Sequence, residues 1–262
     1  MQLIGNHRVF GEYTIGPSFG YVLCILCVCL IVGYWVISSL GIFGRIVFGI
    51  SFSLEIFLLL KTSLTEPGII PRSTNVSGGS TDNIEQIVNG TLFVRKWCHT
   101  CNIYRPPRGK HCGLCNCCID KFDHHCTFLS TCIGVRNHRW FIILLIHTIL
   151  LAAAVLVFGG GDGWIRIVVI ALSVTIILLV GNMLYFHIRL IFKGTTSYEE
   201  SKRAVSESTE YPYSLGGWRI NFFSFWNAPI ENCRFDARQR IIGRPTSEEM
   251  TVLNPKVTQE TQ

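Results

Sequence analysis

Cysteine and histidine recur with a period of 14 residues between Cys98 and Cys132. Two sets of four residues share the spacing C-x2-C-x9-H-x6-C, and the second set is the first displaced by 14 positions. Structural zinc is bound tetrahedrally by four ligands, and three cysteines with one histidine are a common combination. Disulfide frameworks do not use histidine, so the interleaved histidines favour metal binding over cross-linking. The pattern predicts two structural Zn²⁺ ions, one held by Cys98, Cys101, His111 and Cys118 and the other by Cys112, Cys115, His125 and Cys132.

The repeat leaves Cys126 outside both ligand sets. Cys126 opens a third repeat, but Leu129 stands where the second cysteine of that repeat would be, so no third site of this kind is expected. A cysteine attacks as thiolate, and a free thiol with a pKa of about 8.5 is mostly protonated at neutral pH. His124 can accept that proton, and Asp123 can orient the histidine. The alternative is that Asp123 orients a zinc-bound histidine instead.

Long apolar segments lie on both sides of the cysteine-rich stretch. The 262-residue chain is 49% hydrophobic and only 15% charged, and its mean hydropathy is +0.38. Soluble domains carry about 25% charged residues, and a helix needs about 20 apolar residues to cross a bilayer. We therefore expect an all-α bundle of four transmembrane helices with a small cytosolic zinc-binding cysteine-rich domain. The expected spans are Tyr21–Phe43, Ile46–Leu64, Trp140–Phe158 and Ile165–Ile191.

Positively charged residues predict which side of the membrane each segment occupies. The loop between the second and third spans is rich in Lys and Arg, whereas the two opposite loops are very short and carry few. Such loops stay in the cytosol, so both termini and the zinc domain are expected there. The expected organisation is a cytosolic N-terminus (1–20), helices one and two (21–64), a cytosolic linker (65–96), the cysteine-rich domain (97–139), helices three and four (140–192) and a cytosolic C-terminal region (193–262).

Two features of the sequence bear on other function classes. The net charge of +6 is not gathered into a basic helix that could enter a DNA groove, so no nucleic-acid partner is expected. Glu55 lies within the second span, where a charge is costly and often functional. It is expected to pair with His147 or His187 or to stay protonated. An ion or metal transporter built on these three residues is a further hypothesis, although the spans carry few other polar groups.

The segment Asp123-His124-His125-Cys126 within this cysteine-rich repeat resembles the DHHC protein S-acyltransferase (palmitoyltransferase) family. Glu66-Pro67-Gly68 is similar to the Asp-Pro-Gly motif that comes after the second span in that family. Thr196-Ser197-Tyr198-Glu199 is similar to its Thr-Thr-x-Glu motif, and in this register Ser197 is expected to hydrogen-bond near Asp123. The sequence departs from the family at Thr127-Phe128, where Pro-Trp is usual.

The resemblance implies a two-step reaction and a set of partners. Cys126 would take a palmitoyl group from palmitoyl-CoA and pass it to a cysteine of a substrate protein, with His124 as base and Asp123 as its orienting partner. The two zinc sets would be structural. The implied partners are acyl-CoA, the lipid bilayer and membrane-associated proteins with cytosolic cysteines, and the implied location is an endomembrane (Golgi or ER) or the plasma membrane. The alternative function is a catalytically inactive zinc-binding membrane scaffold, for which the Thr127-Phe128 departure is the motive.

Overall fold

A computed structural model describes residues 3–4, 7–8, 40–73, 84–88, 91–159, 163–206 and 211–230. The first expected span, Tyr21–Phe43, lies almost entirely outside the described residues, as does most of the expected N-terminal region. Near the start of the chain, β1 (Leu3–Ile4) pairs with β2 (His7–Arg8) in an antiparallel hairpin.

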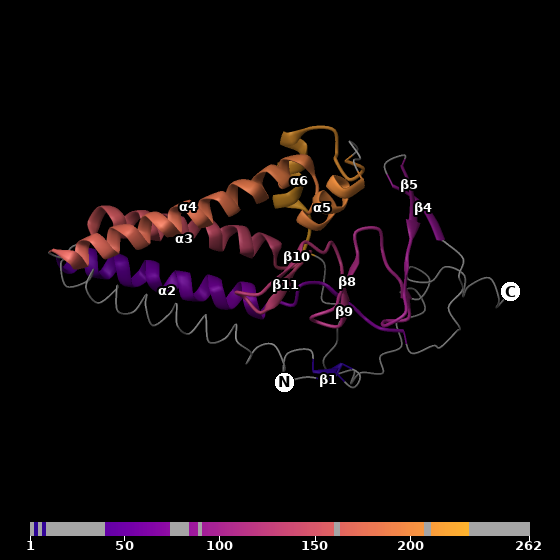
Figure 1. Ribbon diagram of the computed structural model, residues 1–262, viewed down its shortest axis with the longest axis horizontal. Helices are drawn as coiled ribbons and strands as arrows, with labels where there is room; N and C mark the ends of the chain where they lie inside the picture. Colours follow the sequence, from indigo (N-terminus) through magenta and orange to yellow (C-terminus); the bar gives the residue numbers. More distant parts are fainter. Residues whose placement is uncertain are drawn as a thin grey trace.

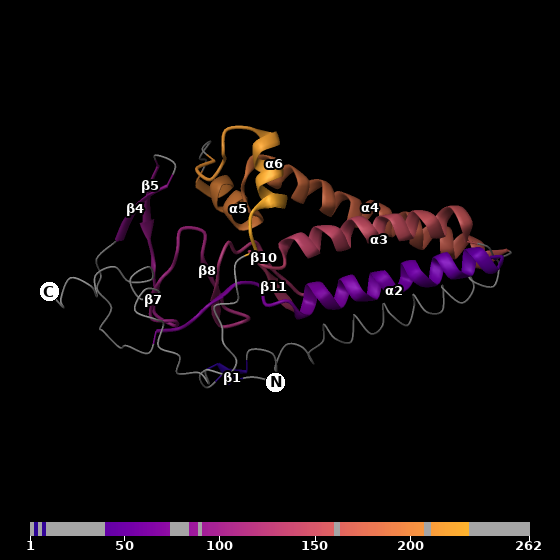
Figure 2. The same ribbon diagram turned by 180° about the vertical axis from the view of Figure 1, so that it is seen from behind.

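Three long apolar helices form one half of the described structure. They are α2 (Ile42–Leu64), α3 (His138–Phe158) and α4 (Trp164–Lys193), and each is long and apolar enough to cross a membrane. They correspond to the second, third and fourth expected spans. α3 packs against both α2 and α4. The helices lie close together at one end and spread apart at the end that carries the β hairpins (Figures 1 and 2).

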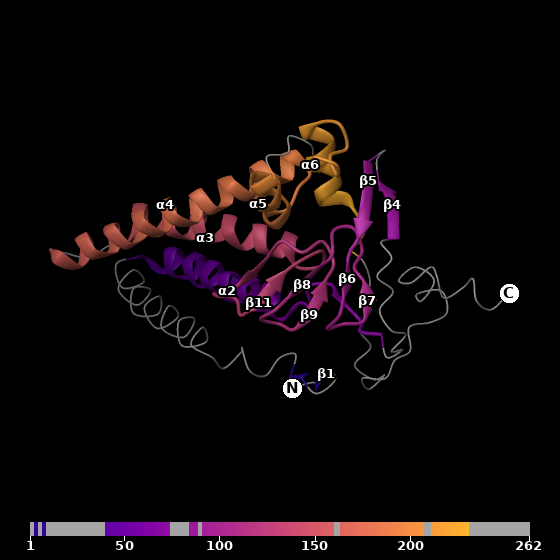
Figure 3. The same cartoon turned by 45° about the vertical axis from the view of Figure 1, so that its right-hand side comes forward.

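The cysteine-rich region is built from short antiparallel hairpins, so the all-α description applies only to the helices. Figure 3 shows the hairpins side by side at the spread end of the helices. Each pairing covers only two or three residues per strand, because the chain turns again after a few residues. The strands are β3 (Ile69–Ile70), β6 (Trp97–Cys98), β7 (Ile103–Tyr104), β8 (Lys110–Cys112), β9 (Cys117–Ile119), β10 (His124–Cys126) and β11 (Thr131–Ile133).

Three of these hairpins repeat the 14-residue period of the sequence. β6 pairs with β7, β8 with β9, and β10 with β11. Each turn has one non-glycine residue in the left-handed region, at Asn102 (φ 52°), Asn116 (φ 51°) and Ser130 (φ 51°). These positions are themselves 14 residues apart, so the repeat is one of backbone conformation as well as of ligands. A separate hairpin of β4 (Ile84–Val88) and β5 (Thr91–Arg95) precedes them.

Asn137 joins the hairpins to the helices at a completely buried position. Its side-chain oxygen accepts a hydrogen bond from the Gly134 amide at 2.9 Å. Its side-chain nitrogen donates to the carbonyls of Cys132 (2.9 Å) and Thr62 (3.3 Å). One amide therefore links β11 to the last turn of α2 and the first turn of α3. Gly134 allows this close approach, because a Cβ there would lie 2.5 Å from the Pro67 carbonyl oxygen.

Two short helices come after α4 and return the chain to the hairpins. They are α5 (Ser197–Ser206) and α6 (Trp218–Asn227), and α6 packs against α4. α4 ends at Gly194, which has a φ of 69° and caps the last turn in the left-handed conformation that glycine adopts without strain. The Asn221 side chain donates to the Phe192 carbonyl at 2.8 Å and so fixes α6 beside this turn.

Candidate metal centres and active site

The first expected ligand set comes together between two hairpins. Cys98 and Cys101 belong to the β6–β7 hairpin, while His111 and Cys118 are a cross-strand pair of β8 and β9. The Nδ1 atom of His111 lies 3.5 Å from the sulfur atoms of Cys98 and Cys101 and 3.8 Å from that of Cys118. All four ligand atoms lie within 4.8 Å of one another.

The second set has the same construction one hairpin further along the chain. Cys112 and Cys115 come from the β8–β9 hairpin, while His125 and Cys132 are a cross-strand pair of β10 and β11. The Nδ1 atom of His125 lies 3.7 Å from the sulfur of Cys112, 3.3 Å from that of Cys115 and 3.6 Å from that of Cys132.

Both clusters fit a tetrahedral metal ion. Zinc bonds of about 2.3 Å to sulfur and about 2.0 Å to nitrogen place the two kinds of ligand atom about 3.6 Å apart at the corners of a tetrahedron. The six sulfur-to-nitrogen distances run from 3.3 to 3.8 Å. The two clusters can therefore each bind a metal ion, and the Cys₃His donor set suits zinc.

Strand alternation separates the residues of β10 into two faces. Successive side chains of a strand point to opposite sides, and His125 points to the second metal cluster. His124 and Cys126 therefore share the other face, which is turned toward the helices. There Cys126 is 6% exposed and belongs to an apolar cluster with Phe141 of α3 and Ile191 of α4.

Asp123 lies buried against the start of α5. Its carboxylate accepts hydrogen bonds from the Ser197 amide (2.8 Å) and the Ser197 hydroxyl (2.7 Å), and the same hydroxyl contacts the Asp123 carbonyl at 2.8 Å. The expected hydrogen bond from Ser197 is therefore present. His124 Nδ1 lies 2.7 Å from the second carboxylate oxygen. Asp123 thus has one partner in the next residue of the chain and one in a segment more than seventy residues away.

The charges and hydrogen bonds around this pair shift both pKa values. Burial by itself raises the pKa of Asp123, but the neighbouring histidines, including His124 through its hydrogen bond, outweigh burial and hold that pKa well below its usual range. Burial lowers the pKa of His124, but its hydrogen bonds with Asp123 and Cys126 outweigh burial and raise the pKa to about 9. His124 is therefore a stronger proton acceptor than a free imidazole.

The immediate environment of Cys126 is largely apolar. Three helices contribute to it, with α3, α4 and α6 supplying partly or fully buried hydrophobic side chains. Leu129, at the position of the missing second cysteine, packs into the same cluster. The residues that pack there are Cys126, Leu129, Ile133, Phe141, Ile142, Leu145, Val180, Met183, Leu184, Ile188, Ile191, Phe222, Phe225 and Trp226.

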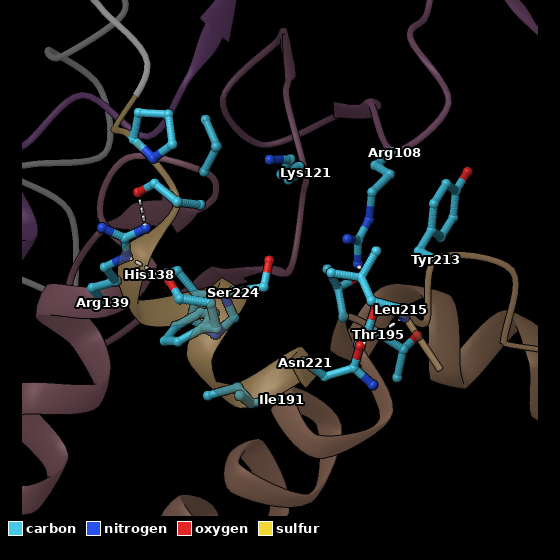
Figure 4. Close-up of a pocket in the computed structure, with 16 residues that line it drawn as sticks. Arg108, Lys121, His138, Arg139, Ile191, Thr195, Tyr213, Leu215, Asn221 and Ser224 are labelled. Atoms are coloured by element: carbon cyan, nitrogen blue, oxygen red, sulfur yellow. Dashed lines mark hydrogen bonds between the residues drawn. The ribbon is translucent and has the colours of Figure 1, made fainter. Parts of the chain in front are cut away.

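A cavity of about 150 Å³ lies beside this site, between the hairpins, the end of α4 and α6 (Figure 4). Arg108, Lys121 and Arg139 contribute basic groups to its lining, and Asn221 and Tyr213 contribute polar ones. Arg108, Lys121 and Arg139 belong to the basic loop between the second and third expected spans, but nothing in the sequence predicts that they line one cavity with Tyr213 and Asn221.

Glu199 organises one wall of this cavity. Its carboxylate accepts two hydrogen bonds from Arg108 (2.7 and 2.6 Å) and one from the Thr196 amide (2.8 Å). The Arg108 guanidinium also lies 4.6 Å from the ring centre of Tyr213. The start of α5 is thereby held to the cysteine-rich region at two points, through Arg108 and through Asp123.

Glu55 and His147 lie apart from this site. Glu55 pairs with His147 at 2.6 Å and accepts a hydrogen bond from Thr148 at 2.6 Å, so it links α2 to α3 within the membrane helices. His187 does not join them but lies 3.8 Å from Asp123. The three residues of the transporter hypothesis therefore do not form one cluster. Cys117 is buried in the hairpin core, and burial raises the pKa of its thiol.

A family model and curated relatives all identify the same protein family. A family model described as DHHC palmitoyltransferase matches residues 93–161. The probable protein S-acyltransferase 7 of Arabidopsis thaliana is 30% identical over 270 residues, which cover 82% of this chain and 60% of that protein. Palmitoyltransferase ZDHHC18-B of Danio rerio is 31% identical over 235 residues, which cover 72% of this chain and 59% of that protein. The chain thus spans about three fifths of the length of these curated relatives.

Proposed function

Because the chain belongs to the DHHC palmitoyltransferase family, we propose that it is a membrane-bound protein S-acyltransferase with Cys126 as the acyl carrier. The observation that carries the proposal is the position of Cys126. Its thiol lies beside the hydrogen-bonded pair of the buried Asp123 and the partly exposed His124, and within an apolar cluster formed by three helices. The first arrangement activates a nucleophile, and the second suits a hydrocarbon chain.

The first step of the proposed reaction loads the enzyme. His124 accepts the proton of Cys126, and the resulting thiolate attacks the carbonyl carbon of the acyl-CoA thioester. A new carbon–sulfur bond forms on Cys126 while the bond to CoA breaks, and the CoA thiolate takes the proton from His124. Asp123 keeps the imidazole oriented through its 2.7 Å contact with Nδ1 and stabilises the imidazolium while it exists.

The second step transfers the acyl group. His124 accepts the proton of a substrate cysteine, whose thiolate attacks the acyl group on Cys126. The Cys126 thiolate leaves and recovers the proton from His124, which returns the enzyme to its starting state. Two metal ions in the Cys₃His clusters would hold the hairpins in shape, with the eight ligands named above, while Cys126 stays free to react.

Palmitoyl-CoA is the proposed donor for two reasons. The apolar cluster next to Cys126 draws side chains from three helices and so suits an alkyl chain, of which each buried methylene contributes about 0.8 kcal/mol. The neighbouring cavity carries Arg108, Lys121 and Arg139, which suit the phosphate groups of CoA (Figure 4).

The proposed setting is the cytosolic face of an endomembrane, either Golgi or ER, or of the plasma membrane. The excess of Lys and Arg on the hairpin side of the described helices supports this orientation. CoA thioesters and the cysteines of membrane-associated proteins would then meet Cys126 from the same side. The substrates are proposed to be such proteins.

Acyl labelling of the purified full-length chain tests the proposal. In detergent with a palmitoyl-CoA analogue, the wild type is expected to acquire a label that hydroxylamine releases, since the bond is a thioester. Cys126→Ser is expected to remain unlabelled while binding the same two metal ions, and Cys117→Ser, a matched substitution in the neighbouring hairpin, is expected to label normally. Labelling of Cys126→Ser would contradict the proposal, and a folded wild type that never acquires label would favour the inactive scaffold.

A further inference from the structure

A second group of potential metal ligands surrounds Asp123 on the side of the helices. It consists of Asp123, His138 at the start of α3 and His187 in α4. One ligand atom of each residue lies within 4.8 Å of the others, and all three residues are buried. His187 Nδ1 lies 3.8 Å from a carboxylate oxygen of Asp123. Neither zinc set includes any of them.

Both histidines in this group have a ring nitrogen without a partner. Nε2 of His138 and Nδ1 of His187 are completely buried and form no hydrogen bond with any described residue. His138 is 9% exposed and His187 is 3% exposed. A buried nitrogen without a hydrogen-bond partner destabilises the folded state. Two such atoms beside one carboxylate therefore indicate a bound species that supplies what the side chains lack.

The chemistry of the three residues matches a transition-metal ion. Two imidazoles and one carboxylate, with a fourth position open to water, form an established ligand set for zinc. Bonds of about 2.0 Å place ligand atoms about 3.3 Å apart in a tetrahedron, so side-chain shifts of about 1.5 Å or less bring the group to that geometry. The negative charge of Asp123 offsets part of the charge of the ion, and the imidazoles bind in their neutral form.

We propose that Asp123, His138 and His187 form a third metal site, which binds Zn²⁺ reversibly and inhibits acyl transfer. The inhibition rests on the proposed function, because it requires that Asp123 orients a catalytic His124. A metal ion on the carboxylate withdraws electron density from the oxygen that contacts His124 at 2.7 Å. The imidazole then loses its orienting partner, so Cys126 is no longer activated.

The surroundings of the group allow an ion to enter. His138 lines the 150 Å³ cavity next to the site, so the cluster is not sealed from it. Two of the basic side chains of that cavity have polar partners within the protein. Arg108 forms its ion pair with Glu199, and Arg139 donates to the carbonyls of Phe225 and Ala228. Asp123 therefore remains the acidic group that faces the two histidines.

Metal content of the full-length protein tests the site without any measurement of activity. The Cys126→Ser background removes the reactive thiol as a competing ligand. After washing with a weak chelator, this protein is expected to hold two Zn²⁺ per chain, and equilibration with free Zn²⁺ is expected to raise the content to three. His187→Gln and His138→Gln in the same background are expected to stay at two. The matched control is His147→Gln, on the same helix as His138 but paired with Glu55, and it is expected to reach three.

Cobalt identifies the ligands of the added ion. Co²⁺ bound at the third site is expected to show the visible absorption of a tetrahedral ion without the sulfur-to-metal charge-transfer band that cysteine ligands produce. A Cys126→Ser protein that never exceeds two ions, or His187→Gln and His138→Gln proteins that still bind a third ion with two intact structural sites, would overturn the proposal. The count of two retained ions shows that each variant is folded.

Inhibition is measured separately on chains with Cys126 intact. Zn²⁺ is expected to reduce the rate of acyl-enzyme formation in the wild type, and His187→Gln is expected to require about tenfold more Zn²⁺ or higher for the same fractional loss. Equal sensitivity of the two proteins would refute the inhibitory role while leaving the metal count to decide the site. If none of the proteins is acylated, the proposed function is contradicted. The third metal site is still decided by the metal content, which does not depend on acylation.

Discussion

The β8–β9 and β10–β11 hairpins are built alike but use their cysteines differently. They share the 14-residue offset, the cross-strand His–Cys pair and a left-handed residue in the turn, at Asn116 in one and Ser130 in the other. In the first hairpin, Cys112 and Cys115 belong to a metal cluster. In the second, Cys126 occupies the position of Cys112 but lies in an apolar cluster with Leu129.

The difference arises from the segment that comes after each hairpin. The ligand set of Cys112 and Cys115 is completed by His125 and Cys132 from the next hairpin. The corresponding positions after β10–β11 are Arg139 and Ile146, which belong to α3. A helix replaces the fourth hairpin, so neither position supplies a ligand that could complete a metal site around Cys126. The same turn geometry therefore places a cysteine in a potential metal cluster in one hairpin and in an apolar cluster in the other, depending on the segment that comes next.

The largest expected effect comes from breaking the metal cluster that joins the two hairpins. Cys115→Ser removes one of four ligands, and structural zinc contributes about 10–16 kcal/mol to small zinc domains. We expect loss of about one metal ion per chain, loss of the hairpin fold and loss of acylation, measured by metal content and limited proteolysis. Cys117→Ala is the control, since Cys117 is a buried cysteine of the same hairpin outside both clusters. Retention of both metal ions by Cys115→Ser would show that the cluster is assigned wrongly.

A large effect is also expected from making the second hairpin resemble the first. Leu129→Cys restores the Cys-x2-Cys spacing around Cys126, so the two thiols can hold a metal ion or oxidise to a disulfide. The rate of acyl-enzyme formation is expected to fall about tenfold or more, and a reductant with a chelator is expected to restore part of it. Leu129→Ala, which loses only packing, serves as the control. If Leu129→Cys labels as fast as Leu129→Ala under oxidising conditions, the two hairpins are not equivalent in geometry.

A smaller effect is expected from substituting Ser197. Its hydrogen bonds to Asp123 lie next to the β10–β11 hairpin. Ser197→Ala removes the hydroxyl bonds to Asp123 and retains the amide bond at 2.8 Å. Loss of hydrogen bonds of this kind costs about 1 kcal/mol, so acyl-enzyme formation is expected to slow about fivefold. Ser197→Thr keeps the hydroxyl and is expected to recover most of the rate. Equal rates for the Ala and Thr variants would exclude a positioning role.

The smallest effect is expected in the turns themselves. Ser130 and Asn116 both have a φ of 51°, where glycine carries no penalty and asparagine carries less than serine. Ser130→Gly is expected to raise stability by about 0.5–1 kcal/mol, and Asn116→Gly to raise it by less. Thermal unfolding of the two variants and the wild type measures both changes in stability. A destabilised Ser130→Gly protein would show that the third turn is not held in the conformation of the second.

The apolar helices and the two Cys₃His clusters are the parts that local sequence predicts well. Apolar length alone indicated the three described spans, and α3 differs from the expected Trp140–Phe158 by only its first turn. The ligand sets came from spacing, because cysteine and histidine have little other reason to repeat. The short strands were missed, since the turns between them are shaped by metal ligands and left-handed residues rather than by alternating hydrophobicity.

The site beside Cys126 depended on contacts between distant segments. Asp123 meets Ser197, Arg108 meets Glu199, and His187 lies beside Asp123 rather than Glu55. Each contact joins residues that are far apart along the chain, so no local pattern reports it. Only the family resemblance directed attention to Ser197, and it offered no indication of the group formed by His138 and His187.

The sequence by itself determined that this chain has apolar spans, two sets of four residues with metal-ligand spacing, and a cysteine outside both sets, Cys126, beside an Asp–His pair. These are properties of residue type and spacing, which survive without coordinates because hydrophobic length and metal valence act locally. The tertiary structure decided where the remaining cysteine points and what lies around it. The packing of the helices determines this environment. α3 begins where the 14-residue repeat would place a fourth hairpin, and the side chains of three helices meet at Cys126 only when the chain is folded.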